Sequence, residues 1–245
     1  MSYKKLGILG GVGPLASVYF TDLLVSGTVA DCDQAHIPFF LYNDVYIPDR
    51  SAFLLGKSDN SPLPALIDGV KQLEGLGCDL IVVTCNTAHY FYDEMAAAVS
   101  VPVLNIIENA LNSAKEQHPN LEKIGILATD GTVEGKVYKN VAEKMGIKYT
   151  SPSAKTQEEI MSLIYDVKIG KEIDPNTILR AAAELEADGC DAVILGCTEL
   201  SVVSRQNRFT EKDSHLIDAM TALAKSCVLL CGKEWKETHQ VCTVL

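Results

Sequence analysis

The sequence predicts an α/β protein of two similar domains, each a mostly parallel sheet flanked by helices. Two observations predict this fold class. Short β-branched runs alternate along the chain with longer amphipathic segments, and one strand-and-loop phrase occurs twice. Alternation of this kind is typical of parallel sheets with helices on both faces. The repeated phrase indicates that the chain is internally duplicated.

Six apolar runs have the length of strands that are buried on both faces. In chain order they cover residues 5–11, 37–43, 78–85, 101–107, 123–129 and 190–197. Helical patterns cover residues 16–27, 63–77, 88–99, 135–146 and 177–189. Several of them end at glycine, a common helix stop. A last apolar helix is predicted over residues 215–230, and we expect it to pack back onto the first half.

The duplication appears in two pairs of segments. GCDLIVVTCNTAH begins at Gly77 and GCDAVILGCTEL begins at Gly189, while KLGILGGVG at Lys5 resembles KIGILATDG at Lys123. Both pairs occur in the same order, which favours two related halves over coincidence. We therefore predict a first domain of residues 1–105 plus 206–245 and a second domain of residues 106–205.

Composition excludes several classes of function. The 245 residues include 21 basic and 32 acidic residues, a net charge of -11, which disfavours binding to nucleic acid or to an anionic membrane. A small anionic substrate stays possible, because a few local cations can dominate a cleft. No apolar run approaches the roughly 20 residues of a membrane-spanning helix.

The chain has eight cysteines, and its first residues lead directly into a strand-like segment without a signal sequence. We therefore expect a reduced, cytoplasmic protein. The last four residues, CTVL, have the form of a prenylation box, but no basic cluster precedes Cys242. We interpret this match as chance unless the source is eukaryotic.

Two cysteines are candidates for chemistry. Cys85 and Cys197 each end a predicted strand and are followed by Thr within two residues. In parallel sheets ligands lie outside the carboxyl ends of the strands, where helix N-termini favour anions and can lower a thiol pKa. If the halves face each other, two thiols on opposite sides of one carbon are suited to inverting a stereocentre. The other cysteines are interpreted as structural: Cys32, Cys78, Cys190, Cys227, Cys231 and Cys242.

Two other interpretations of these residues stay open. Zinc is possible at Cys85, His89 and Cys197, although the close-spaced ligand pairs of zinc sites are missing. The loop from Gly11 through Gly13 formally matches a dinucleotide fingerprint. The match is weak, since no acidic residue ends the second strand at the expected distance, and these glycines can equally bring N–H groups to a carboxylate. We expect no metal and no cofactor.

Several motifs together resemble the aspartate/glutamate racemase superfamily, in particular its aspartate and broad-specificity amino-acid racemase branch. They are GGVGP at Gly10, IPDR at Ile47, CNTAH at Cys85, VK at Val167 and GCTEL at Gly196. The resemblance covers residues 5–205. It implies a cofactor-independent racemase of two similar α/β domains, usually a homodimer, with Cys85 and Cys197 as the paired acid and base in the interdomain cleft.

The resemblance also implies which residues bind a small acidic amino acid. The arginine of IPDR and the lysine of VK, here Arg50 and Lys168, would bind the side-chain carboxylate. Asn86, Thr87 and Thr198 would donate hydrogen bonds to the α-carboxylate, whose charge grows when the α-proton leaves. Three further positions of the cleft complete the expected set: Val12 and Gly13 in the glycine loop, and Thr129 for the α-amino group.

Other activities remain possible at this stage. Within the superfamily they are those of a hydantoin racemase, a maleate isomerase or a decarboxylase, and the charge of the substrate side chain separates them. Outside it, a two-domain protein that closes on a small anion without turning it over would tolerate loss of both thiols. His89 is interpreted as a structural residue on a helix face, and Glu199 as a residue that orients groups around Cys197 or caps the following helix.

Overall fold

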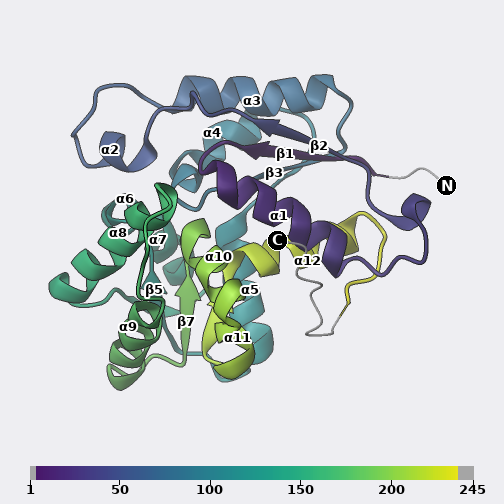
Figure 1. Cartoon of the computed structure of the whole chain (residues 1–245). Coiled ribbons are helices and arrows are strands. Elements are labelled where there is room, and N and C mark those ends of the chain that lie inside the picture. Colours follow the sequence, from purple (N-terminus) through teal and green to yellow (C-terminus); the bar gives the residue numbers. More distant parts are fainter. Residues whose placement is uncertain (1–3, 237–245) are drawn as a thin grey trace.

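The computed structural model describes residues 4–236, which form two four-stranded sheets, one above the other in Figure 1. The first sheet has the order β2-β1-β3-β4, and the second has the order β6-β5-β7-β8. Neighbouring strands are parallel throughout. The strands are β1 (Leu6–Gly10), β2 (Phe39–Asn43), β3 (Leu80–Val83), β4 (Val103–Leu104), β5 (Lys123–Leu127), β6 (Lys148–Thr150), β7 (Ala192–Leu195) and β8 (Leu216–Asp218). The identical order of strands confirms the predicted fold class and its duplication.

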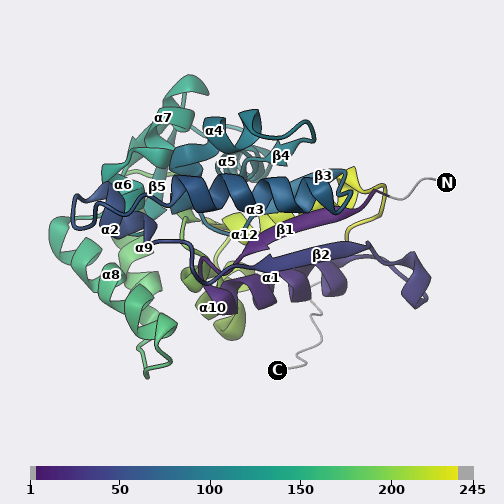
Figure 2. The ribbon, with the colours of Figure 1, turned by 90° about the horizontal axis from the view of Figure 1, so that it is seen from above.

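The helices cover both faces of each sheet. They are α1 (Pro14–Gly27), α2 (Arg50–Leu54), α3 (Leu63–Gly75), α4 (Tyr92–Ala97), α5 (Ile106–Gln117), α6 (Asp130–Glu134), α7 (Val137–Lys144), α8 (Ala154–Lys168), α9 (Asn176–Ala187), α10 (Thr198–Asn207), α11 (Phe209–Lys212) and α12 (Ala219–Leu230). Two short 3-10 helices are labelled η1 (Asp33–Ala35) and η2 (Thr87–Phe91). Seen from above in Figure 2, α3 lies over the first sheet and α1 lies beneath it.

Each predicted strand is present, and all six are shorter than the predicted runs, one of them the most. The run at residues 101–107 forms only the two residues of β4. The side chain of Asn105 stops it, because Oδ1 accepts the N–H of Ile107 at 2.9 Å and so caps the start of α5. An Asn at the N-cap competes with strand pairing in this way.

The predicted helix over residues 215–230 is partly wrong. Leu216 to Asp218 form β8, and Asp218 then caps α12 by accepting the N–H of Met220 at 3.1 Å. A short apolar run fits a strand as well as a helix turn, so periodicity alone did not separate them. The strand β6 and the helix α8 were also not predicted.

Strand β8 also corrects the expected division of the chain. We placed residues 206–245 with the first domain, but β8 pairs with β7 and extends the second sheet. Helix α12 packs against α1 of the first half and against α5. Strand β8 and helix α12 therefore connect this segment to both halves rather than to the first alone.

A single core cluster joins the two halves. It contains buried residues of β1 and β5 together with residues of α1, α5 and α12, such as Ile8, Phe20, Ile126 and Leu223. Two further clusters lie on the outer faces, one under α3 and α4 and one under α8 and α9. Because the inner core is continuous, the carboxyl ends of β3 and β7 are held at a fixed separation.

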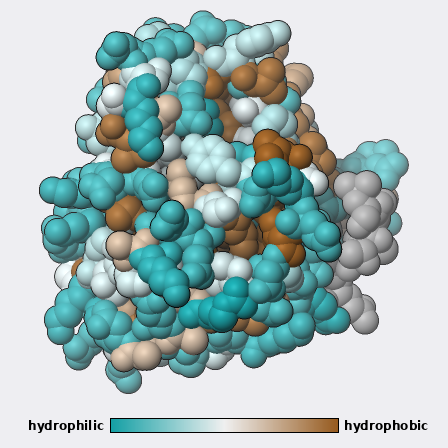
Figure 3. All heavy atoms as spheres, turned by 60° about the vertical axis from the view of Figure 1, so that its left-hand side comes forward, coloured by the Kyte–Doolittle hydropathy of each residue, from teal (hydrophilic) through white to brown (hydrophobic). Residues whose placement is uncertain are grey.

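Hydrophilic residues cover most of the face seen in Figure 3, with hydrophobic residues in small separate patches. Among residues 4–236 no helix is both long enough and apolar enough to cross a membrane. The CTVL sequence and Cys242 lie outside the described residues.

Candidate active site

One pocket between the halves contains both candidate cysteines. Cys85 follows β3 and Cys197 follows β7, and each residue is only 6% exposed. The structure brings nearly all of the predicted site residues to this pocket: Val12, Arg50, Cys85, Asn86, Thr87, Thr129, Lys168, Cys197 and Thr198. Gly13 is not among its lining residues. Asp49, Ser51 and Glu199 complete the lining.

The sheet register places each thiol at the pocket. The N–H of Thr84 bonds to the carbonyl of Leu9 at 3.0 Å, and in the second half Gly196 bonds to Leu127 at 2.8 Å. These bonds hold the residue that follows each strand and precedes each cysteine against the neighbouring strand, β1 in the first sheet and β5 in the second. Cys197 is the N-cap of α10, so it lies at the positive end of a ten-residue helix. Cys85 is followed by η2 instead.

Glu199 contacts the Cys197 thiol. The thiol donates to Oε2 of Glu199 at 3.0 Å, and the hydroxyl of Thr198 donates to the same oxygen at 3.1 Å. Burial raises the pKa of Cys197 well above its usual value, and the charge of Glu199 adds to the shift while Lys168 opposes it. The Cys197 thiol is therefore protonated at rest, with a carboxylate beside its proton.

His89 holds the backbone on the other side. Its Nδ1 lies 2.8 Å from the carbonyl oxygen of Cys85, and its Nε2 accepts the N–H of Ile106 at 3.2 Å. The proton is therefore on Nδ1. Both nitrogens are used, which argues against the zinc site and agrees with the structural role predicted for His89. Burial lowers the pKa of His89 to about 4.

The neutral His89 makes stability depend on pH. Its folded pKa is below the unfolded value, so the unfolded chain binds the proton more readily and stability falls as pH drops from about 6.5 to about 4. The shift corresponds to about 3 kcal/mol. We expect His89→Gln to be less stable at pH 7 and to lose less stability than the native chain between pH 7 and pH 4.5, measured by urea unfolding. His118→Gln is the control, and equal pH slopes in all three proteins would contradict the expectation.

Three threonine hydroxyls form a ring across the cleft. Oγ1 of Thr87 lies 3.0 Å from that of Thr129 and 2.9 Å from that of Thr132, and the last two are 3.0 Å apart. Each hydroxyl has one proton, so a closed ring uses all three protons. Thr87 belongs to the first half and the other two to the second, so the ring joins the halves. Thr132 was not predicted from the sequence.

Asn86 presents an amide donor to the pocket. Its Oδ1 accepts the hydroxyl of Tyr138 at 2.6 Å. Its Nδ2 is buried and has no hydrogen-bond partner among the described residues. Since buried donors in proteins are normally paired, this unpaired nitrogen indicates a place for a ligand acceptor.

The two predicted cations reach the pocket from opposite halves. Arg50 uses Nη1 to bond the carbonyl of Pro48 at 3.0 Å and Nη2 to bond that of Val12 at 3.0 Å, while its buried Nε has no partner. Lys168 lies near the end of α8. Desolvation acts to lower its pKa, but interaction with nearby acidic groups, Glu199 foremost, outweighs this and raises it. Lys168 is thus charged and close to both thiols.

The glycine loop is shaped by close packing. Gly11 has φ +86, and a Cβ there would lie 2.2 Å from the backbone of Asp44. A Cβ on Gly13 would lie 2.5 Å from Oε1 of Glu199. Gly13 therefore lets the first half approach the carboxylate beside Cys197, which accounts for this glycine without a dinucleotide.

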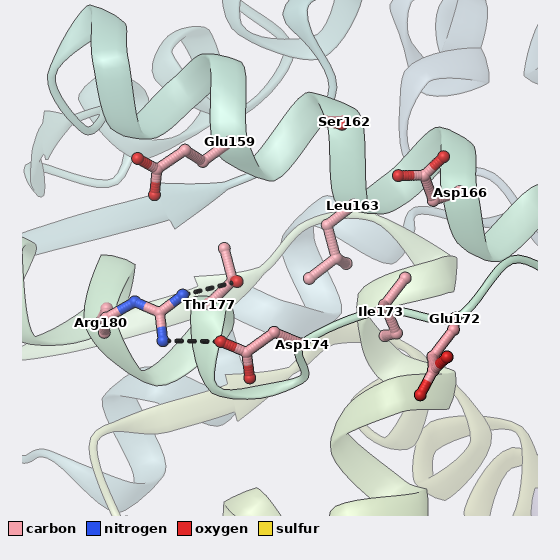
Figure 4. A pocket seen from close by; sticks show the side chains of 9 residues that line it. All are labelled: Glu159, Ser162, Leu163, Asp166, Glu172, Ile173, Asp174, Thr177 and Arg180. Carbon is pink, nitrogen blue, oxygen red and sulfur yellow. Dashed lines mark hydrogen bonds and ion pairs between the residues drawn. The ribbon is translucent and has the colours of Figure 1, made fainter.

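A second hollow lies outside this site, between α8 and the start of α9 (Figure 4). Its charged lining is mainly acidic, and its one cation, Arg180, already bonds Asp174 and Thr177 at 2.9 Å. A cluster of Glu186, Asp213 and His215 has the spacing of metal ligands, but none of these residues is buried. Neither place offers a free cation to an anionic ligand.

The sequence analysis places Glu199 beside Cys197 but does not include it, Asp49 or Ser51 among the predicted site residues. Asp49 caps α2 and Ser51 lies within it, on either side of Arg50, and Ser51 packs on Gly131, where a Cβ would lie 2.6 Å from the Cα of Ser51. Such contacts between segments that are distant in sequence leave no local pattern.

The fold, two parallel α/β halves with one pocket between them, is that of a racemase with duplicated halves. The family model for Asp/Glu/hydantoin racemases matches residues 9–227. The chain belongs to this family.

Relatives agree with this assignment over almost the whole chain. The broad specificity amino-acid racemase RacX of Bacillus subtilis is 28% identical over 230 residues, which cover 91% of this chain and 96% of that protein. The Picrophilus torridus aspartate racemase superposes with a TM-score of 0.81 at 32% identity and 96% coverage of both chains. The glutamate racemase of Aquifex pyrophilus is 27% identical over 184 residues, 74% of this chain and 70% of that protein.

Proposed function

We propose that this racemase interconverts the enantiomers of an acidic amino acid, aspartate first and glutamate second, without a cofactor. The observation that carries the proposal is the single buried pocket in which Cys85 and Cys197 come from opposite halves and two cations lie beside them. The kinship with an aspartate racemase and a broad-specificity racemase supports it.

The chemistry needs one base and one acid on opposite faces of Cα. One cysteine, as thiolate, takes the α-proton, and the opposing thiol gives its proton to the other face. The net reaction moves no proton in or out of the pair, and the two cysteines exchange roles in the reverse direction. To start in the reverse direction, the free enzyme needs Cys85 as the thiol and Cys197 as the thiolate. Glu199, whose Oε2 lies 3.0 Å from the sulfur, takes up the proton that Cys197 holds at rest before that step begins.

The α-carboxylate gains charge as the proton leaves, and donors that are already oriented stabilise it. Nδ2 of Asn86 is buried and unpaired at the pocket, and the first N–H groups of α10 have no helical acceptor. The hydroxyls of Thr87 and Thr198 are engaged within the protein, so the amide and the helix N-terminus are the better donors. The threonine ring, whose protons are used internally, is suited to accept from the α-ammonium at Thr129.

The side-chain carboxylate would meet Arg50 and Lys168. Nε of Arg50 is buried without a partner, and the edge formed by Nε and Nη2 can hold a carboxylate with two bonds. Backbone carbonyls fix the guanidinium through Nη1, which bonds Pro48, and through one hydrogen of Nη2, which bonds Val12, and the second hydrogen of Nη2 stays available at that edge. Lys168 adds a positive charge from α8. Two cations at one end of the pocket favour a dicarboxylic amino acid over a neutral one.

Racemisation in deuterated water tests the proposal. Incubation with L-aspartate should give both loss of optical rotation and deuterium at Cα, and D-aspartate should give the same. A panel of glutamate, alanine, maleate and a hydantoin shows which substrate the enzyme prefers. If no amino acid shows either signal, the proposed function is wrong, and retained aspartate binding would then favour the non-catalytic anion-binding alternative. Turnover of the hydantoin or of maleate instead would point to the other activities of the superfamily.

Glu199→Gln is expected to lower kcat by about 100-fold, because an amide cannot take the Cys197 proton. Gln keeps the size of the side chain and an acceptor oxygen, so the fold and KM should change little. Initial rates with both enantiomers of aspartate measure the effect. Glu186→Gln, outside the pocket, is the control. A kcat within twofold of the native value would show that Glu199 is not a proton acceptor.

Two expectations concern the oligomeric state of the protein and its location in the cell. A homodimer is proposed, and analytical ultracentrifugation at micromolar concentration would test it. A cytoplasmic location is proposed as well, and fractionation of the source cells would test it.

A further inference from the structure

Something has to hold the Asn86 amide in its functional orientation. The residue is 2% exposed and lines the pocket, and its buried Nδ2 has no hydrogen-bond partner among the described residues. A buried unpaired donor is costly, so a free amide would turn to find a better arrangement. Only a specific contact on the opposite side of the amide can prevent this turn.

Tyr138 makes that contact from the other half of the molecule. It lies on α7, its side chain is fully buried, and its hydroxyl donates to Oδ1 of Asn86 at 2.6 Å. Burial raises the pKa of Tyr138 well above its usual value, so the hydroxyl keeps its proton. If the amide were turned, the hydroxyl would face Nδ2 and its proton would have no acceptor among the described contacts. Tyr138 therefore selects one of the two amide orientations.

The ring of Tyr138 contacts the second strand end. A Cβ on Gly196, the residue before Cys197, would lie 3.0 Å from Cε2 of Tyr138. The matching residue before Cys85 is Thr84, so the two copies differ here. The glycine leaves room for the ring. One side chain thus touches the strand end of Cys197 with its ring and the neighbour of Cys85 with its hydroxyl.

We propose that Tyr138 is a positioning residue of the active site, which fixes the Asn86 amide with Nδ2 toward the substrate α-carboxylate and holds the two cysteine-bearing strand ends in register. The part of this inference that concerns the carboxylate rests on the proposed function. The part that concerns the amide orientation does not, and the two are tested separately.

The kinetic test removes only the hydroxyl. Tyr138→Phe should lower kcat for aspartate by about tenfold or more with little change in KM, because the donor to the growing carboxylate charge is no longer held in place. In an Asn86→Ala background the same change should alter kcat less than twofold, since its effect passes through Asn86. Tyr92→Phe is the control, because the Tyr92 hydroxyl bonds the carbonyl of Val103 at 3.0 Å away from the pocket. Equal losses in both backgrounds would overturn the positioning role.

The second test needs no turnover. The side-chain amide signal of Asn86, identified by its loss in Asn86→Ala, should exchange slowly with water in the native chain and about tenfold faster in Tyr138→Phe. Unchanged exchange would overturn the inference, whatever the activity. If the native chain racemises nothing while exchange does accelerate, the proposed function fails and the orienting role of Tyr138 stands.

Discussion

Cys85→Ser and Cys197→Ser are each expected to lower racemisation of aspartate by at least about 1000-fold, because a serine hydroxyl is a far weaker acid and base than a thiol. Each variant keeps one working cysteine. That cysteine can still remove the α-proton from the enantiomer whose α-hydrogen points toward it. The two variants should therefore incorporate deuterium from opposite enantiomers without inverting them, as measured by NMR.

The repeated phrases supply the control for this experiment. Cys78 and Cys190 occupy equivalent places in the two copies, and both are buried at the start of a strand. Burial raises the pKa of both thiols, for Cys190 to about 11, and neither residue lines the pocket that contains Cys85 and Cys197. Cys78→Ser and Cys190→Ser should keep full kcat. Comparable losses in all four variants would mean that serine disturbs the fold and that the assignment of the pair is unsupported.

Arg50→Lys and Lys168→Met should each lower kcat/KM for aspartate by about 100-fold while lowering that for alanine far less. A charge-assisted hydrogen bond lost from a buried carboxylate accounts for a change of this size. Lysine keeps the charge of Arg50 but not the paired donors of its edge. Arg50 also bonds the carbonyls of Val12 and Pro48, so some loss with every substrate is expected.

The ratio of aspartate to alanine turnover is therefore the decisive measurement. Lys171→Met is a matched control for Lys168, because Lys171 lies just beyond α8 and pairs with Asp166 at 3.1 Å. It should leave the ratio unchanged. If the Arg50 and Lys168 variants also leave it unchanged, the substrate is not selected by its side-chain charge and the acidic-substrate proposal is wrong.

The strands and the positions of Cys85 and Cys197 at strand ends were predictable because their signals are local. A strand that is buried on both faces has a continuous apolar sequence. The end of that apolar run is enough to show that the cysteine lies at the end of the strand. The same argument failed at β8, where Leu216 to Asp218 looks like the first turn of α12. Tertiary pairing with β7 made it a strand.

The details of the site were not predictable, because they depend on contacts between the halves. Arg50 was expected to bind the side-chain carboxylate, and backbone carbonyls of Val12, Ile47 and Pro48 already occupy two of its nitrogens. Thr87 was expected as a hydroxyl donor, but its proton is used within the ring with Thr129 and Thr132. Val12, Thr129 and Thr132 are distant in sequence from the residues that they bond, and no periodic pattern in the sequence indicates such contacts.

The residues alone established two sheets of the same kind and two cysteines, out of eight, at equivalent strand ends. Apolar runs and a repeated phrase are properties of neighbouring residues, so they can be recognised from the sequence alone. Only the tertiary structure decided what surrounds those cysteines: Glu199 against one thiol, and Tyr138 reaching from the second half to Asn86 in the first. Hydrogen bonds act over about 3 Å, and which groups come that close is set by packing across the shared core.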